Sequence, residues 1–215
     1  ILIANFSDKT YIDMFKVALL LFAGIFVSDG LRADVVDLTY VYETRCPYCL
    51  EFLHEQFYDG YQQVGSYVNL TLLTFAKIDD DGDVYCQHGD NECFISRAQV
   101  CAFKNGISQN RQVEFLYCTE TKAWDGLDIT EDDVKVCLAN VLTEVSWNDV
   151  QSCMISGEAD ELLKAIYVKA KSYGVSYVPS LIFFGRHDVD LEDSARDNFV
   201  ATICGLLSNQ PEVCN

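Results

Sequence analysis

The chain has few basic residues for its size. Among its 215 residues, 15 lysines and arginines stand against 33 aspartates and glutamates, so the formal net charge at pH 7 is -18. Because like charges repel at long range, this balance argues against nucleic acid or an anionic membrane surface as a partner. The sequence also lacks internal repeats and low-complexity linkers, and half of its residues are apolar. These features predict one domain with a sizeable core.

A long apolar run is missing as well. Residues 17–27 form an apolar run of eleven residues, whereas a membrane-spanning helix needs about 20 and a signal-peptide core roughly 7 to 15. The run follows Lys16 and ends in small and polar residues up to Gly30. We interpret residues 1–30 as an upstream segment and signal peptide, with an N-terminal core helix as the alternative. The mature form, residues 31–215, is then expected to have no membrane anchor.

Cysteine, by contrast, is plentiful. The ten cysteines are mostly scattered rather than grouped in ligand pairs, which favours disulfides and an oxidising compartment over a cytosolic metal site. In the secretory pathway, Asn69-Leu70-Thr71 would be an acceptor for N-glycosylation at Asn69.

Local patterns predict a β-α-β unit early in the chain. Residues 35–42 are almost all apolar, β-branched or aromatic, as in a strand buried on both faces. Residues 69–76 predict a second strand, parallel to the first and joined to it by a right-handed crossover. Between them, apolar residues at spacings of 3, 4, 4 and 3 predict one face of a helix: Leu50, Leu53, Phe57, Tyr61 and Val64.

The rest of the chain predicts an interrupted core. The acidic run 79–83 lacks the ligand spacing and closing glutamate of a calcium loop, so it is predicted to be a solvated turn. A cysteine-bearing helical insertion is predicted at about 78–156, with a helix beginning near Thr130. Then follow a helix over 159–173, a strand over 180–184, a pairing strand over 188–191 and a helix over 194–207. This order predicts an α/β fold: a thioredoxin-like core with an inserted cysteine-rich helical subdomain.

The chemistry centres on Cys46-Pro47-Tyr48-Cys49, which opens the first predicted helix. A thiolate attacks disulfides, and a helix N-terminus lowers the pKa of a thiol placed there. Pro47 suits the first helical position because its missing N–H removes no hydrogen bond. We therefore predict that Cys46 attacks and that Cys49, one turn later, resolves the mixed disulfide. An ordinary thiol pKa of about 8.5 leaves on the order of one thiol in 3,000 ionised at pH 5, so activity in acid requires a lowered pKa at Cys46.

Several other residues complete the predicted site. Val178-Pro179 is expected to be cis and to face the cysteine pair, forming a substrate groove with Pro47 and Tyr48; an ordinary trans proline is the alternative. Thioredoxins usually hold a buried aspartate six residues before the first cysteine, but Tyr40 stands there. Glu43 is either a helper in proton transfer or a surface residue. His54 and His187 are predicted to be surface residues.

A longer motif follows in the predicted insertion. It consists of CQHG, two free positions, Glu-Cys and a later cysteine: Cys86, Gln87, His88, Gly89, Glu92, Cys93 and Cys101. It resembles the signature of the gamma-interferon-inducible lysosomal thiol reductase (GILT) family, except that Ser96 stands where the family normally has asparagine. The similarity extends from Val35 to Cys214. It implies reduction of protein disulfides at acidic pH in endosomes, lysosomes or outside the cell, with a small-thiol electron donor and no tightly bound cofactor.

The sequence alone leaves alternatives open for the disulfide pairing and for the function. Cys93 and Cys101 lie about 12 Å apart on a straight helix, too far to pair with each other, and only Cys204 with Cys214 is predicted as a disulfide. A secreted, disulfide-stapled binding module with a structural CxxC is one alternative function, and a disulfide oxidase or isomerase is another. A zinc site built from Cys46, Cys49, Cys86 and His88 is disfavoured because a long helix follows the CxxC, so no metal is expected.

Overall fold

The computed structural model describes residues 33–104 and 106–215. The predicted upstream segment and signal peptide, residues 1–30, lie outside these ranges. None of the helices within them combines the length and apolar character needed to cross a bilayer.

A four-stranded sheet in the order β2-β1-β5-β6 forms the centre of the fold. β1 (Val36–Tyr42) runs parallel to β2 (Val68–Thr74) and antiparallel to β5 (Ser180–Phe183), which pairs with β6 (Arg186–His187). The predicted β-α-β unit is therefore confirmed. β1 is not buried along its whole length, however, since Asp37 is exposed.

The predicted helix after β1 is present and contains an irregular turn. It comprises α2 (Pro47–Phe52), a π-helical turn (Leu53–Phe57) and α3 (Tyr58–Val64), and a 3-10 turn (Gly65–Tyr67) leads into β2. All five residues of its predicted apolar face are buried. π-helical turns inside α-helices are frequent at functional sites, and this one begins four residues after Cys49.

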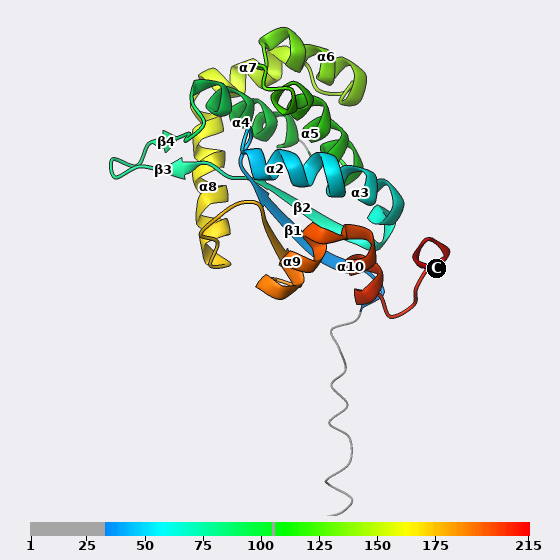
Figure 1. Ribbon diagram of the computed structural model, residues 1–215. Helices are drawn as coiled ribbons and strands as arrows, with labels where there is room; N and C mark the ends of the chain where they lie inside the picture. Colours follow the sequence, from blue (N-terminus) through cyan, green and yellow to red (C-terminus); the bar gives the residue numbers. More distant parts are fainter. Residues whose placement is uncertain (1–32, 105) are drawn as a thin grey trace, which may run out of the picture. The chain divides into compact units, whose positions relative to one another are not determined.

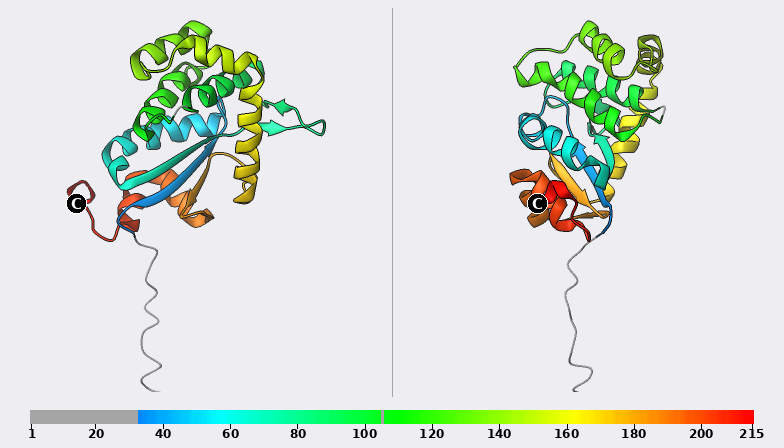
Figure 2. Two further views of the ribbon diagram at one scale, coloured as in Figure 1. Left: turned by 180° about the vertical axis from the view of Figure 1, so that it is seen from behind. Right: turned by 90° about the vertical axis from the view of Figure 1, so that its right-hand side faces the viewer.

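Helices cover both faces of the sheet (Figures 1 and 2). On one face, core residues of β1 and β5 pack with α2, α3 and α10 (Phe199–Leu206). On the other face, Val41 and Ile182 pack with Ala170 of α8 (Glu158–Ser172). Together with the parallel β1–β2 pair, this is the layered arrangement of the predicted thioredoxin-like core.

The segment for which the sequence predicts a helical insertion holds a short hairpin followed by helices. Its elements are β3 (Lys77–Ile78), β4 (Val84–Tyr85), α4 (Asp90–Phe103), α5 (Gln109–Trp124), α6 (Glu131–Val141) and α7 (Trp147–Ile155). The acidic run forms the hairpin turn, where Asp79 Oδ1 accepts the backbone N–H groups of Asp81 and Asp83 at 3.0 and 2.9 Å. Thr130 caps α6 reciprocally with Asp133, as the sequence predicts.

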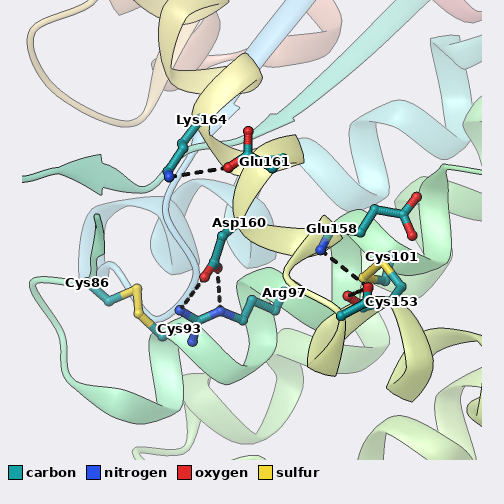
Figure 3. A network of polar contacts seen from close by, with 10 residues as sticks. Cys86, Cys93, Arg97, Cys101, Cys153, Glu158, Asp160, Glu161 and Lys164 are labelled. Atoms are coloured by element: carbon teal, nitrogen blue, oxygen red, sulfur yellow. Dashed lines mark hydrogen bonds and ion pairs between the residues drawn. A yellow bond between two sulfur atoms is a disulfide. The ribbon is translucent and has the colours of Figure 1, made fainter. Parts of the chain in front are cut away.

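Three disulfides fasten these helices. They join Cys86 to Cys93, Cys101 to Cys153 and Cys118 to Cys137. Cys93 and Cys101 thus pair with other partners, as the helical spacing requires. Arg97 of α4 also contacts Asp160 of α8 through two nitrogens, at 2.6 and 3.3 Å, between two of these disulfides (Figure 3). α4 is therefore attached to α7 by a disulfide and to α8 by an ion pair.

The C-terminal predictions need two corrections. Residues 188–191 do not form a strand, because Asp188 caps α9 (Val189–Asp197) by accepting the N–H of Leu191 at 3.1 Å. The single helix predicted over 194–207 is divided at Asn198, whose side chain caps α10 at 3.0 Å. In both places a short polar side chain satisfies free backbone N–H groups and starts a new helix. A 3-10 turn (Glu212–Cys214) follows.

Candidate active site

The two cysteines of the CxxC lie at the start of α2, directly after β1. Cys46 is the N-cap residue and its carbonyl oxygen accepts the N–H of Leu50 at 2.9 Å, while Pro47 occupies the first turn. Both thiols are free, and the residues are only 4% and 3% exposed. The sequence prediction of a helix-opening dithiol agrees with this placement.

The two thiols differ in acidity. The pKa of Cys46 is lowered to about 7, chiefly because the Cys49 thiol donates a hydrogen bond to its sulfur, with help from the backbone N–H groups of Cys49 and Tyr48; burial and the nearby Glu43 oppose the shift. Burial raises the pKa of Cys49 well above its ordinary value, and the charge of Cys46 adds to the effect. Cys46 is therefore the more readily ionised of the two, and Cys49 remains a thiol.

A hollow of about 610 Å³ lies next to Tyr48 of the CxxC motif. Tyr48, which is 64% exposed, forms part of its wall. The other lining residues come from the α2 helix, its π-helical turn and α9: Glu51, Phe52, Glu55, Gln56, Asp193, Arg196 and Asp197. The hollow therefore adjoins the CxxC motif through Tyr48, and neither cysteine lines it.

The Val178–Pro179 peptide bond is cis, as the sequence analysis expects. Ser180, the next residue, pairs with Val41 near the carboxyl end of β1. This register places the cis bond at the end of the sheet from which the chain continues to Cys46. Neither Val178 nor Pro179 lines the hollow next to Tyr48, so the predicted groove is not one continuous pocket.

The turn before Cys46 is held by residues that no local sequence pattern indicates. Arg45 has a φ of 60°, an uncommon backbone conformation for a side chain of this size. Its backbone N–H donates to Glu120 Oε2 at 3.0 Å, and its guanidinium donates to Asn91 Oδ1 at 2.7 Å and pairs with Asp128 at 2.9 Å. Glu120 and Asn91 belong to helices separated from Arg45 by many residues, so no local pattern could have indicated them.

Ser96, which replaces the asparagine of the family signature, also supports this turn. Its hydroxyl lies 2.9 Å from the hydroxyl of Thr44, and Thr44 also donates to the carbonyl oxygen of Glu92 at 3.0 Å. Both hydroxyl residues are fully buried. Serine at this position is therefore compatible with a satisfied polar contact beneath the turn.

The signature residues form the turn that starts α4. The Cys86–Cys93 disulfide closes this turn, and Gly89 has a φ of 93°, which strongly favours glycine. The buried Glu92 accepts the backbone N–H of His88. Burial raises the pKa of Glu92 to about 7, with smaller upward contributions from Glu43 and Cys46.

Glu43 is a buried residue at the centre of several contacts. It is 2% exposed, its backbone oxygen accepts the N–H of Cys46 at 3.4 Å, and its Oε2 accepts a hydrogen bond from Gln87. His88 Nε2 lies 3.5 Å from the same oxygen. Burial raises the pKa of Glu43, and Lys77 and Gln87 lower it. The structure thus excludes the surface alternative for Glu43.

The predictions for two other histidines were wrong. The side chain of His187 is only 12% exposed and contacts the fully buried Glu192 at 2.9 Å. The ring of His54 packs between Tyr117 and Trp124, with centroids 4.8 and 5.0 Å away. Both were missed because their neighbours come from folding of the following helices, not from the local pattern.

The structure also shows where the remaining predicted residues lie. Cys204 is bonded to Cys214, which confirms the one predicted pairing. Asn69 is exposed on β2, and its side chain donates to Asp37 at 2.8 Å. Cys86, bonded to Cys93, cannot supply a thiolate to the zinc site considered above. Within the described ranges, no group of three or more histidine, cysteine and carboxylate side chains is placed to hold a metal.

A thioredoxin-like core with two free cysteines at a helix N-terminus, one of them with a lowered pKa, defines a thiol-disulfide oxidoreductase. Comparison of folds agrees with the thioredoxin-like core. The structure is similar to that of oxidised BdbD from Bacillus subtilis, with a TM-score of 0.57 and 12% identity, covering 83% of this chain and 92% of that one. A likeness at this identity concerns the fold alone.

Sequence comparison identifies the family. Residues 37–141 match the family model described as gamma interferon inducible lysosomal thiol reductase (GILT). The chain is 30% identical over 200 residues to the gamma-interferon-responsive lysosomal thiol protein of Arabidopsis thaliana, covering 86% of this chain and 77% of that protein. It is 26% identical over 191 residues to the gamma-interferon-inducible lysosomal thiol reductase of Carassius auratus, covering 85% and 73%. The chain belongs to the GILT family.

Proposed function

We propose that the protein reduces disulfides of polypeptide substrates through Cys46 and Cys49. The Cys46 thiolate attacks one substrate sulfur, forms a mixed disulfide and releases the first substrate thiolate. Cys49 loses its proton and attacks the Cys46 sulfur, which forms the Cys46–Cys49 disulfide and releases the second thiolate. The substrate gains two electrons and two protons, and the dithiol loses them.

The observation that carries this proposal is the opposite pKa shift of the two thiols. An N-cap thiol with a pKa of about 7 is a ready nucleophile, while the buried neighbour stays protonated until it is needed. The reducing direction is proposed from the family, because the matched family model and the Carassius relative are named thiol reductases.

The dithiol must then be regenerated. We assign this step to a small thiol, two molecules of which are oxidised to their disulfide while the Cys46–Cys49 disulfide is reduced. No tightly bound cofactor is required for this exchange.

The proposed compartment is acidic. The Arabidopsis and Carassius relatives are named as lysosomal proteins, and the disulfide-rich helices suit an oxidising secretory route. We therefore place the mature protein in lysosomes or endosomes, or outside the cell, after removal of residues 1–30 and with a glycan at Asn69.

The test is reduction of a denatured, disulfide-bonded protein by the purified mature chain with a small thiol donor at about pH 4.5 and 7. Cys46→Ser and Cys49→Ser should each abolish turnover. The matched control is the double variant Cys204→Ala/Cys214→Ala, which removes a disulfide of α10 and should keep turnover as long as it is folded.

The outcomes separate the competing functions. Turnover that depends on Cys46 at both pH values supports the reductase. If the chain instead equilibrates with glutathione as a strong oxidant and introduces disulfides faster than it removes them, the oxidase or isomerase alternative is correct. Absence of any reaction of Cys46 with disulfides would leave a binding module.

A further inference from the structure

Resolution of the mixed disulfide requires Cys49 to lose its proton, yet Cys49 is 3% exposed. The position that holds an aspartate in thioredoxins is Tyr40, whose hydroxyl donates to the Cys49 carbonyl oxygen at 3.3 Å. Burial raises the pKa of Tyr40 well above its ordinary value, so Tyr40 is no base. The proton must have another acceptor.

Two buried carboxylates share a narrow cavity with Cys49. Glu43 and Glu120 line it together with Tyr40, Tyr42 and leucine side chains, and it has no room for a water molecule. Burial raises the pKa of Tyr42 as it does that of Tyr40, so the two carboxylates are the candidate acceptors within the cavity.

Both carboxylate oxygens of Glu120 already accept hydrogen bonds from other parts of the fold. One of its oxygens accepts the backbone N–H of Arg45 and the other accepts Gln99 Nε2, both at 3.0 Å. Gln99 is not titratable and Arg45 does not give up its proton in proteins. A proton received by Glu120 would have no titratable neighbour in these contacts through which to leave.

Glu43 has such a neighbour. Its Oε2 lies 3.5 Å from His88 Nε2, and the His88 side chain is 27% exposed. Gln87 donates to the same carboxylate oxygen and accepts a hydrogen bond from Lys77, which orients it. The titratable and charged groups around Glu43 come from β1, the start of α2, β3, the signature turn, α4 and α5: Tyr40, Tyr42, Cys46, Cys49, Lys77, His88, Glu92 and Glu120.

We propose that Glu43 accepts the proton of Cys49 during resolution and that His88 passes it to solvent, with Gln87 as a positioning residue. The inference rests on the proposed reductase function. As the Cys49 S–H bond breaks, the proton goes to the Glu43 carboxylate, and the sulfur forms the bond to Cys46 while the Cys46–substrate S–S bond breaks. The departing substrate thiolate keeps the electron pair and is protonated by solvent. The CQHG motif thereby contributes to turnover as well as to the start of α4.

The experiment is a single turnover of the reduced chain with a symmetric aromatic disulfide, without donor, followed by absorbance of the released aromatic thiol. Attack by Cys46 releases the first equivalent and resolution by Cys49 releases the second. In Glu43→Gln the first release should keep its rate within about threefold, and the second should slow by about 100-fold, the usual scale of a lost general base. Glu43→Asp should recover part of this loss, and His88→Asn should slow the second release by a smaller factor.

The pH profile separates proton transfer from a structural role. In the unchanged chain, the second release should slow as the pH falls through the pKa of Glu43, because the protonated carboxyl cannot accept; in Glu43→Gln this dependence should vanish. A second release that is unaltered in Glu43→Gln at every pH overturns the inference. So does slowing in Glu120→Gln with none in Glu43→Gln, because Glu120 would then be the acceptor. Failure of the first release in the unchanged chain would instead refute the proposed function.

Discussion

The hydrogen bond from Cys49 to Cys46 is the main reason that the pKa of Cys46 falls from the roughly 8.5 to 9 of an ordinary cysteine to about 7. Replacing Cys49 by alanine removes the donor and leaves the other, smaller effects. We expect the pKa of Cys46 to move back toward 9 in Cys49→Ala. Cys49→Ser is the matched control, because a hydroxyl in the same place can still donate to the thiolate.

The magnitude follows from the ionised fraction. At pH 7, a pKa of about 7 gives roughly half thiolate, whereas a pKa of about 9 gives roughly 1%. The more basic thiolate is also the better nucleophile, by about eightfold for a change of about two pKa units at a Brønsted coefficient of about 0.45. The net fall in reactivity of Cys46 at pH 7 is therefore only about sixfold, and the pH midpoint is the clearer observable.

The assay is the rate of alkylation of Cys46 by iodoacetamide between about pH 4 and 10. The midpoint should lie near 7 in the unchanged chain, stay within about one pH unit in Cys49→Ser and approach 9 in Cys49→Ala. An equal midpoint in Cys49→Ala and in the unchanged chain would show that helix N–H groups, not the second thiol, set the acidity of Cys46.

Two further predictions concern stability. The Cys101–Cys153 disulfide closes a separation of 52 residues, and its loss should lower the free energy of unfolding by about 4 kcal/mol. Loss of Cys204–Cys214, with a separation of 10, should lower it by about 3 kcal/mol. Urea denaturation of the paired Cys→Ala variants measures both losses, and equal losses would contradict loop closure as the cause. Burial raises the pKa of Glu120 to about 7, so its contribution to stability is full below about pH 4.5 and is lost as the pH rises through 7, on the order of 3 kcal/mol. Glu120→Gln should flatten the rise in unfolding free energy between pH 7 and 5, and an unchanged slope would assign that rise to other groups.

The β-α-β unit and the dithiol could be predicted because their signals are local. The apolar spacing after Cys49 and the cysteine pair at a helix start each lie within a few turns of chain. The C-terminal strand was misplaced for an equally local reason. The apolar residues of 188–191 suggest a strand, but Asp188 satisfies backbone N–H groups that a strand would have paired, so the chain turns into α9.

Most of the polar surroundings of the dithiol could not be predicted, because they come from three separate parts of the chain. Arg45 and Glu43 precede Cys46 in sequence, but Glu120 reaches the site from α5 and Gln99 from α4. Their meeting depends on the tertiary placement of the disulfide-linked helices. The sequence revealed the absence of an aspartate at Tyr40 and offered Glu43 as a helper in proton transfer, but nothing in the local pattern indicated Glu120 or Gln99.

In the proposed acidic compartment, the small ionised fraction of Cys46 limits the rate of its attack on disulfides. At pH 5, a pKa of about 7 leaves on the order of 1% of Cys46 as thiolate, about 30 times more than an ordinary cysteine but about 50 times less than at pH 7. Acid also protonates Glu43, the acceptor proposed for Cys49. Each chemical step should therefore be slower in acid, while the fold gains stability there because Glu92 and Glu120 are neutral below about pH 7. With a small, freely accessible disulfide the rate should rise from pH 4.5 to 7, and an acidic optimum should arise only with folded substrates whose disulfides acid exposes. An acidic optimum with the small disulfide would mean that the pKa of Cys46 is far below 7.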